Sequence, residues 1–194
     1  MKQTTWLSSW KVAGACLLLV AFAAILHPRN VVAQTSGQLS TVRGNPHDFD
    51  FEFGSWKAHV RIRPPLSHSN TWVSYDGTSV VRKVWRGRAN LGELEVANRH
   101  SHLEGLTLRL YHPQTRQWYV YFSNSADGEL GVPSIGGFSH GRGEFFDRES
   151  LHGKPVDVKF VFSDISTRSF KFVQSYSGDN GKTWIVNWDS TFTR

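Results

Sequence analysis

The sequence predicts an all-β protein, a single antiparallel up-and-down barrel of about ten strands. Nearly every segment after Gly54 alternates between apolar and polar residues, as strands with one buried face do. Short turns rich in glycine, proline, aspartate and asparagine separate these segments, and no window keeps a helical period. The first strand opens on Gly54-Ser55-Trp56, and many small ligand-holding barrels begin in this way, with the indole closing one end.

Residues 1–33 are predicted to be a secretory signal peptide that is removed. Lys2 and Lys11 give it a positive flank, Val12 to Leu26 is an apolar run of the usual length, and Val31-Val32-Ala33 supplies small residues before a cut. We therefore expect a periplasmic or secreted protein. An uncleaved N-terminal anchor, the one membrane contact expected of this chain, is the alternative.

Residues 34–46 are expected to form a polar linker, and residues 47–194 a single barrel domain large enough for its own core. The whole chain has 22 basic and 16 acidic residues, and the signal segment holds three of the basic ones, which leaves 19 against 16. A net charge of about +3, spread over many strands, is ordinary surface chemistry. It argues against nucleic acid as a partner, because nucleic-acid binding needs clustered positive charge.

The segment from His47 to Phe53 alternates aromatic and acidic residues. In an extended segment this places Phe49, Phe51 and Phe53 on one side and the carboxylates on the other. The first strand is expected over residues 56–63, where apolar side chains alternate with His59 and basic residues.

Further strands are expected at residues 70–75, 78–86, 91–98, 105–112, 116–123, 142–147, 156–163, 168–177 and 183–193. Asp76-Gly77 and Gly136-Gly137 are among the expected turns. Residues 144–152 can hold one short helical turn at most. Residues 124–139 form the longest stretch without a strand pattern, and they are a candidate lid. The last strand is expected to close beside the first.

Three segments carry a resemblance to a known family. They are His47-Asp-Phe-Asp-Phe-x-x-Gly-x-Trp56, Gly105-Leu-Thr-Leu-Arg-Leu-Tyr-His-Pro-Gln-Thr-Arg-Gln-Trp118, and Ser177-Gly-Asp-Asn-Gly-Lys-Thr-Trp184 through Phe192-Thr-Arg194. Together they resemble the bacterial domain-of-unknown-function 1579 family over residues 47–194. The resemblance implies a lipocalin-like (calycin) barrel and no particular activity. His112-Pro113 stands where many relatives have Asp-Pro.

Several motifs have a structural interpretation that outweighs a catalytic one. The Asp-box pattern Ser177 to Trp184 occurs once, which predicts a tight hairpin and not a repeated propeller. Gly137-Phe-Ser-His-Gly141 spells a nucleophile elbow, but a strand and not a helix is expected after it. His100-x-His102 lacks a third metal ligand at a telling spacing.

No metal and no cofactor are expected. The only cysteine, Cys16, lies in the predicted signal peptide, so the mature chain has no disulfide, thiol nucleophile or thiolate ligand. A haem would need a well-placed proximal histidine, and no histidine follows His152.

Polar tips on aromatic strands mark the candidate ligand site. A pocket for an organic molecule needs apolar walls with a few oriented polar groups. Gln174 and Tyr176 are in phase with Phe170 and Phe172, and Trp188 is expected in one stripe with Trp184 and Val186. The predicted ligand-binding residues are Arg82, Tyr121, Gln174, Tyr176 and Trp188. Packing in a filled core is the alternative for the aromatic ones.

Two arginines are singled out as charges that the barrel can bury. Arg82 is inward if the face of Val80 and Val84 is inward, and it then needs a carboxylate such as Glu93 or Glu95. Arg109 lies opposite the face of Leu106, Leu108 and Leu110.

Three functions follow from these observations. The leading one is noncatalytic binding of a small apolar or amphipathic molecule. The second is an enzyme (an isomerase, cyclase or hydrolase) that uses polar groups such as His59, Tyr121 or Glu144. The third is an interaction module whose barrel is filled by its own aromatic side chains.

Overall fold

The computed structural model describes residues 41–194, and the predicted signal peptide lies outside them. Two short 3₁₀ helices, η1 and η2, cover Asp50–Glu52 and Trp85–Gly87. The strands are β1 (Gly54–Ile62), β2 (Val73–Val84), β3 (Ala89–Ala97), β4 (His102–His112), β5 (Gln117–Asn124), β6 (Ser134–Ser139), β7 (Arg142–Leu151), β8 (Lys154–Ser163), β9 (Ser169–Ser177) and β10 (Ile185–Thr193).

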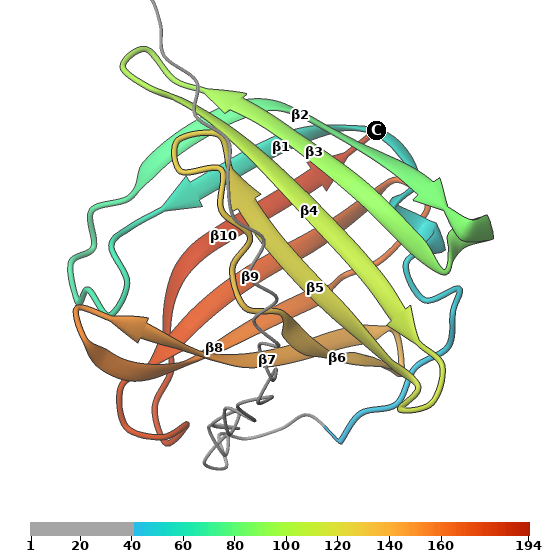
Figure 1. Ribbon diagram of the computed structural model, residues 1–194. Helices are drawn as coiled ribbons and strands as arrows, with labels where there is room; N and C mark the ends of the chain where they lie inside the picture. Colours follow the sequence, from blue (N-terminus) through green and yellow to red (C-terminus); the bar gives the residue numbers. More distant parts are fainter. Residues whose placement is uncertain (1–40) are drawn as a thin grey trace, which may run out of the picture. The chain divides into compact units, whose positions relative to one another are not determined.

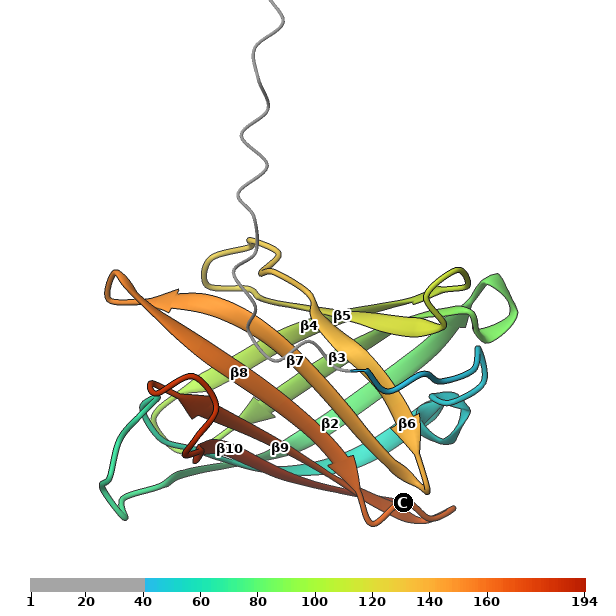
Figure 2. The same cartoon turned by 90° about the horizontal axis from the view of Figure 1, so that it is seen from below.

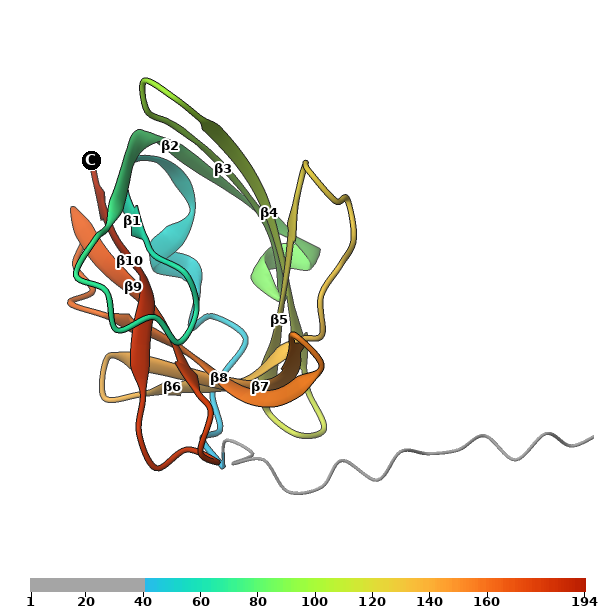
Figure 3. The same ribbon diagram turned by 90° about the vertical axis from the view of Figure 1, so that its left-hand side faces the viewer.

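The ten strands form a closed antiparallel barrel in which each strand pairs with its neighbours in the chain. Figures 1 and 2 show the strands following one another around the molecule, and Figure 3 looks into the ring that they make. β10 closes on β1, with pairs running from Lys57↔Thr193 to Ile62↔Trp188. The predicted fold class is therefore confirmed, and the barrel closes without any residue before 41.

The Gly-x-Trp sequence closes one end of the barrel, as predicted. Gly54 has a φ of 104°, which favours glycine. Trp56 is buried, and its Nε1 donates a hydrogen bond of 2.7 Å to the Glu52 carbonyl. The Arg194 guanidinium lies 4.0 Å from the Trp56 ring centre and donates to the Phe53 carbonyl. Arg194 thus links the end of β10 to the start of β1.

The segment before β1 differs from its predicted extended form. The Asp50 and Glu52 amides donate to the carbonyls of His47 and Phe49, which winds the segment into η1. This turn breaks the alternation of faces, so Glu52 points inward beside Phe49 and is 3% exposed. The expectation that all the carboxylates would face away from the aromatic residues was wrong.

Two glycines that predicted turns lie inside strands. β2 runs unbroken through Gly77, where an added Cβ would lie 2.0 Å from the Glu95 carbonyl oxygen. Gly136 lies in β6, and its Cβ would lie 1.9 Å from the Glu144 carbonyl oxygen. Both glycines permit close approach of neighbouring backbones. The prediction therefore divided β2 into two strands and missed β6. Because these two errors cancel, the predicted total of ten strands is nevertheless correct.

Two other regions differ from the prediction. β7 continues to Leu151, so the short helical turn allowed over residues 144–152 does not form. The predicted irregular stretch shrinks to the segment between β5 and β6, residues 125–133. Its Gly131 amide donates to the Phe122 carbonyl, and β5 pairs with β6 over Trp118–Val120. Its role as a lid stays a prediction.

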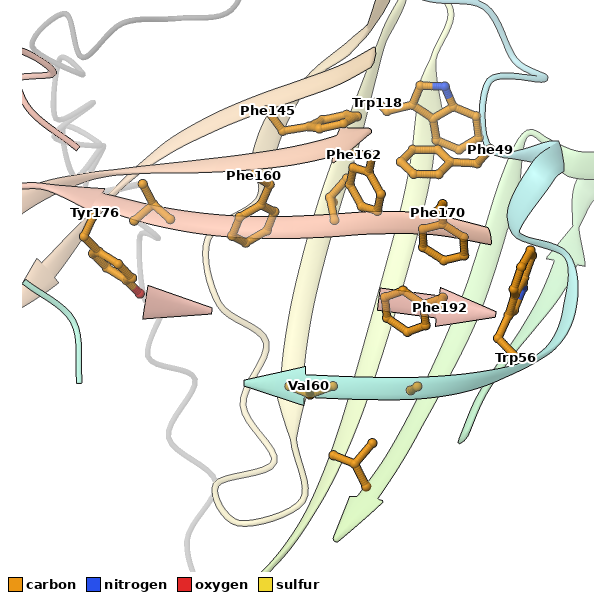
Figure 4. Packing of buried hydrophobic residues seen from close by; sticks show 14 of the residues in the cluster. Phe49, Trp56, Val60, Trp118, Phe145, Phe160, Phe162, Phe170, Tyr176 and Phe192 are labelled. Atoms are coloured by element: carbon orange, nitrogen blue, oxygen red, sulfur yellow. The ribbon is translucent and has the colours of Figure 1, made fainter. Parts of the chain in front are cut away.

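An aromatic cluster fills the end of the barrel that η1 covers. Phe49 is fully buried at its centre, with ring centres of Phe138, Trp118 and Phe162 at 4.9, 5.0 and 5.3 Å. All three contacts are edge-to-face, an arrangement that aromatic pairs favour. Figure 4 shows the cluster around Phe49 and Trp118, with Tyr176 well away from it. This cluster closes one end of the cavity inside the barrel.

The described part of the predicted linker packs on the barrel. The Gly44 amide donates to the Arg116 carbonyl, and Trp118 Nε1 donates to the Asn45 carbonyl at 3.0 Å. Within residues 41–194, no helix has the length and apolar character needed to cross a membrane.

Candidate functional site

A cavity lies inside the barrel, above the aromatic cluster. Its empty space is about 670 Å³, including the part that opens to solvent. The cavity volume open to water is about 80 Å³, several times the roughly 10–15 Å³ that one water requires. The lining residues are Glu52, Ser79, Gly92, Glu93, Leu94, Thr107, Arg109, Val120, Phe122, Phe160, Phe162, Phe172, Gln174, Trp188 and Phe192.

The deepest polar group of the cavity is a buried ion pair. Arg109 on β4 lies 3.0 and 3.1 Å from the two carboxylate oxygens of Glu52 and donates to Asn90 Oδ1 at 2.9 Å. The Arg109 guanidinium also lies 4.8 Å from the centre of the Phe49 ring. The pair therefore joins η1, β3 and β4 at the top of the aromatic cluster.

Burial governs the electrostatics of this pair. Desolvation raises the pKa of Glu52 and lowers the pKa of Arg109, and the attraction between the two opposes both shifts. The guanidinium keeps its charge, because its ordinary pKa lies far above neutral pH. Arg109 Nε and Asn90 Nδ2 are buried donors without a hydrogen-bond partner. Buried donors of this kind are costly unless a partner reaches them.

The upper walls of the cavity are aromatic. Phe122 on β5 and Trp188 on β10 meet edge to face at 6.0 Å, and Phe160 and Phe172 meet across β8 and β9 at 5.3 Å. Trp188 Nε1 is already engaged, because it donates to Ser190 Oγ at 2.6 Å. Within residues 41–194, the Gln174 side chain makes no hydrogen bond, so its amide is available to a guest in the cavity.

The structure brings two of the five predicted ligand residues into the cavity, Gln174 and Trp188. Tyr176 is 8% exposed and faces the interior next to Val158, but it lies outside the cavity lining and donates to Glu149 Oε2 at 3.1 Å. Its contribution to ligand binding stays a prediction.

Arg82 and Tyr121 lie on the outer face of the barrel. On β2 the inward residues are Ser79 and Val81, so Arg82 points to solvent, where it pairs with Glu93 at 3.0 Å. Glu93 is one of the two partners expected for Arg82, but the face of Val80 and Val84 points outward, so the condition for a buried Arg82 is not met. On β5, Val120 and Phe122 take the inward positions, which leaves Tyr121 outside.

Trp188 faces inward because of a β-bulge. The register between β10 and β9 shifts between Val186 and Trp188. The extra residue reverses the side of the strand on which the following side chains lie. Trp184 and Val186 are therefore outside, and Trp184 packs on Phe146 and Lys159. The predicted stripe of Trp184, Val186 and Trp188 was wrong, although its member Trp188 does reach the cavity.

The residues considered for an enzyme lie outside the cavity lining. His59 is exposed on β1 and is 2.7 Å from an Asp76 carboxylate oxygen. Glu144 pairs with Arg142 at 2.9 Å, on the face of β7 opposite the buried Phe145. With Tyr121 also outside, these groups do not converge.

A second inward group was not predicted from the sequence. Asp147 and Glu149 follow Phe145 on the inner face of β7, where the Ser134 hydroxyl donates to Asp147. Burial raises the pKa of Asp147 to about 7, and burial also raises the pKa of Glu149. The signal for them was the alternation Phe145, Asp147, Glu149, and the strand predicted over residues 142–147 ended too early to use it.

The remaining motifs take the forms expected of structural elements. Asp179 accepts hydrogen bonds from Thr183, Ser177 and Lys182, and these bonds hold the pKa of its carboxyl well below the usual range. The Asp-box is thus a tight hairpin, as predicted. Ser139 ends strand β6, His140 begins the turn to β7, and strand β7 follows them.

His102 has neighbours that its spacing to His100 did not reveal. Its ligand atoms and those of Glu95 and Glu104 lie within 4.8 Å of one another on the exposed face of β3 and β4. His100 is not in this group, and it accepts a hydrogen bond from Arg99.

The closed antiparallel barrel with its internal cavity has a lipocalin-like fold. No protein-family model matches the chain, and no curated protein does either. Among solved structures it is similar to the S-type phycobiliprotein lyase CPES from Guillardia theta, with 12% sequence identity and a TM-score of 0.52. The likeness covers 81% of this chain and 94% of that one. At this identity the comparison shows the fold alone.

Proposed function

We propose that the barrel binds a small amphipathic molecule without converting it. The observation that carries this proposal is the cavity itself, whose aromatic walls stand above a buried ion pair with an unpartnered donor at Arg109 Nε. Such a combination of apolar walls and a few fixed polar groups is typical of ligand pockets.

The distribution of polar groups indicates how the ligand lies. Its apolar body would contact Phe122, Phe172 and Trp188. Its acceptor, a carbonyl, hydroxyl or carboxylate oxygen, would lie near the Gln174 amide or the Arg109 guanidinium. Because Glu52 already compensates the charge of Arg109, a neutral acceptor is as suitable as an anionic one.

Three further parts of the proposal rest on the sequence and on the fold's neighbour. Residues 1–33 have the pattern of a signal peptide, which supports export to the periplasm or beyond. The three segments that resemble the domain-of-unknown-function 1579 family support membership of that family. The structural neighbour is a lyase of phycobiliproteins, which supports a small-molecule guest for this barrel too.

A pair of neighbouring substitutions on β4 tests the cavity. Thr107 lines it, and Leu108 points to the outer face. Thr107→Trp fills the space and should abolish the fluorescence enhancement of an anilinonaphthalene sulfonate dye, whereas Leu108→Trp should leave the dye affinity unchanged. Equal dye affinities for Thr107→Trp and the unaltered protein would show that the cavity is not the binding site.

A further inference from the structure

The turn between β2 and β3 exposes a tryptophan among positive charges. Trp85 is 64% exposed and Val84 is 41% exposed. Lys83, Arg86 and Arg88 surround them in the chain, and all three are exposed. Adjacent large apolar side chains exposed at a protein surface, with polar residues around them, are typical of an interaction site.

The backbone of this turn is strained in a way that keeps Trp85 outside. Trp85 and Arg86 have φ values of 49° and 60°, and Gly87 follows with 97°. Left-handed backbone costs about 1 kcal/mol or more for each residue other than glycine. The turn is nevertheless fixed to the barrel, because the Arg88 carbonyl accepts a hydrogen bond of 2.9 Å from the Tyr111 amide. This strained backbone places the Trp85 indole in solvent and adds nothing to core packing. We therefore expect its function to lie at the surface.

The fold gathers positive charge around this turn, contrary to the expectation of an even spread. In an antiparallel meander, alternate turns lie at the same end, and Figure 1 shows the β2–β3 and β4–β5 turns both on the right-hand side of the barrel. Exposed basic residues at this end are Arg43, Lys83, Arg86, Arg88, Arg116, Arg142, Arg168 and Arg194. Exposed carboxylates at the same end are fewer: Asp50 lies beside Gly87 of the turn, Asp164 lies in the β8–β9 turn, and the half-buried Glu144 pairs with Arg142. Among residues 41–194, no carboxylate lies within ion-pair distance of Lys83, Arg86, Arg88 or Arg116. The turns of the opposite end mix Arg99, Lys154 and Lys182 with Asp127, Glu129 and Asp179.

We propose that the β2–β3 turn docks this end of the barrel onto an anionic lipid surface, with Trp85 and Val84 entering the interface and Lys83, Arg86 and Arg88 contacting headgroups. Tryptophan flanked by lysine and arginine is the composition of membrane–water interfaces. This contact is separate from the cavity and from any role of residues 1–33 as an anchor.

The test uses residues 34–194, which contain the whole closed barrel and lack the apolar run. Their co-sedimentation is measured with phosphatidylcholine vesicles with and without phosphatidylglycerol, at low and high salt. We expect binding to the anionic vesicles only, with an affinity that falls as salt rises.

Two variants locate the contact. Lys83→Ser/Arg86→Ser/Arg88→Ser should weaken vesicle binding by about a hundredfold, since each of the three charges near the surface contributes about fivefold. The matched control, Arg99→Ser/Lys154→Ser/Lys182→Ser, removes three charges at the opposite end and should change the affinity less than about twofold. Trp85→Gly should weaken binding while leaving the urea midpoint equal or higher, because glycine relieves the left-handed backbone.

Three results would overturn the proposal. The first is no binding to the anionic vesicles, and the second is an equal loss in the turn variant and its control. The third is binding to soluble polyglutamate without binding to vesicles, which would identify an acidic protein as the partner of this end.

Discussion

The ion pair of Glu52 and Arg109 is the residue-scale feature on which the site depends. The side chains of Glu52 and Arg109 are 4% and 7% exposed, so folding includes the free-energy cost of desolvating both charges. The pair is useful because it fixes a guanidinium at the cavity floor, held by a carboxylate on one side and by Asn90 on the other. Removing either partner leaves an uncompensated charge in a site that is almost inaccessible to solvent.

Glu52→Gln should therefore lower the free energy of unfolding by about 3–5 kcal/mol. Glu93→Gln is the matched control, because it breaks the Arg82–Glu93 pair, whose side chains are 61% and 51% exposed. That control should cost less than about 1 kcal/mol. Urea unfolding measures both, and similar costs for the two variants would contradict the buried arrangement.

Asp147 should make the stability of the barrel depend on pH. Its pKa is raised to about 7, so between about pH 4 and 7 the folded protein binds more protons than the unfolded chain. The free energy of unfolding should fall as the pH rises through this window and then level off. Asp147→Asn should flatten this slope and stabilise the protein at pH 8 by on the order of a few kcal/mol.

The measurement is urea unfolding at several pH values. Asp76→Asn removes an exposed carboxylate and serves as the control, since it should leave the slope in place. A slope that survives in Asp147→Asn would have to come from Glu149 or from another group, and it would contradict this assignment.

At the scale of elements, the barrel depends on places where strands approach unusually closely. The alternation of side chains located most strands correctly, because one face of each is buried. Glycine was the misleading residue, since it marks turns and also marks close backbone approaches. Gly77 and Gly136 are of the second kind, and the distinction depends on the neighbouring strand, which local sequence does not specify. The bulge between Val186 and Trp188 was hidden for the same reason.

Gly136→Ala tests the close approach of β6 and β7. The added Cβ would lie 1.9 Å from the Glu144 carbonyl oxygen, so the sheet has to move. We expect a loss of at least about 3 kcal/mol in the free energy of unfolding, or no folded protein. Gly131→Ala is the control, because its Cβ would meet only the Phe122 carbonyl oxygen at 3.6 Å. It should change stability by about 0.5 kcal/mol or less, and circular dichroism with urea unfolding distinguishes the two.

At the scale of the whole molecule, the barrel has a filled end and a hollow middle. The aromatic cluster around Phe49 fills one end, and the cavity begins where Arg109 and Glu52 meet it. The alternative was a barrel filled throughout by its own aromatic residues. Aromatic residues fill the barrel at that end only. The same filled end carries the exposed basic residues and Trp85.

The site was partly predictable, and the reason lies in the direction of the strand faces. On β4 the leucines at 106, 108 and 110 face outward, and Thr107 and Arg109 face inward. A strand's own pattern normally places the leucines inside. A barrel that keeps a cavity with a few polar groups can reverse this preference on one strand, and closure with the other strands decides which face is inner. Gln174 could be found because the phenylalanines of β9 share its face, whereas Glu52 was hidden by the turn of η1.

The most direct test of ligand binding in the cavity is a comparison of native and denatured mass spectra. The full chain would be expressed in a host that exports it, and the protein would be purified without denaturant. We expect an additional stoichiometric mass of a small molecule in the native spectrum that is lost on denaturation and is absent from Thr107→Trp. A native mass equal to that of the polypeptide, unchanged after incubation with lipid and pigment extracts, would contradict small-molecule binding in the cavity.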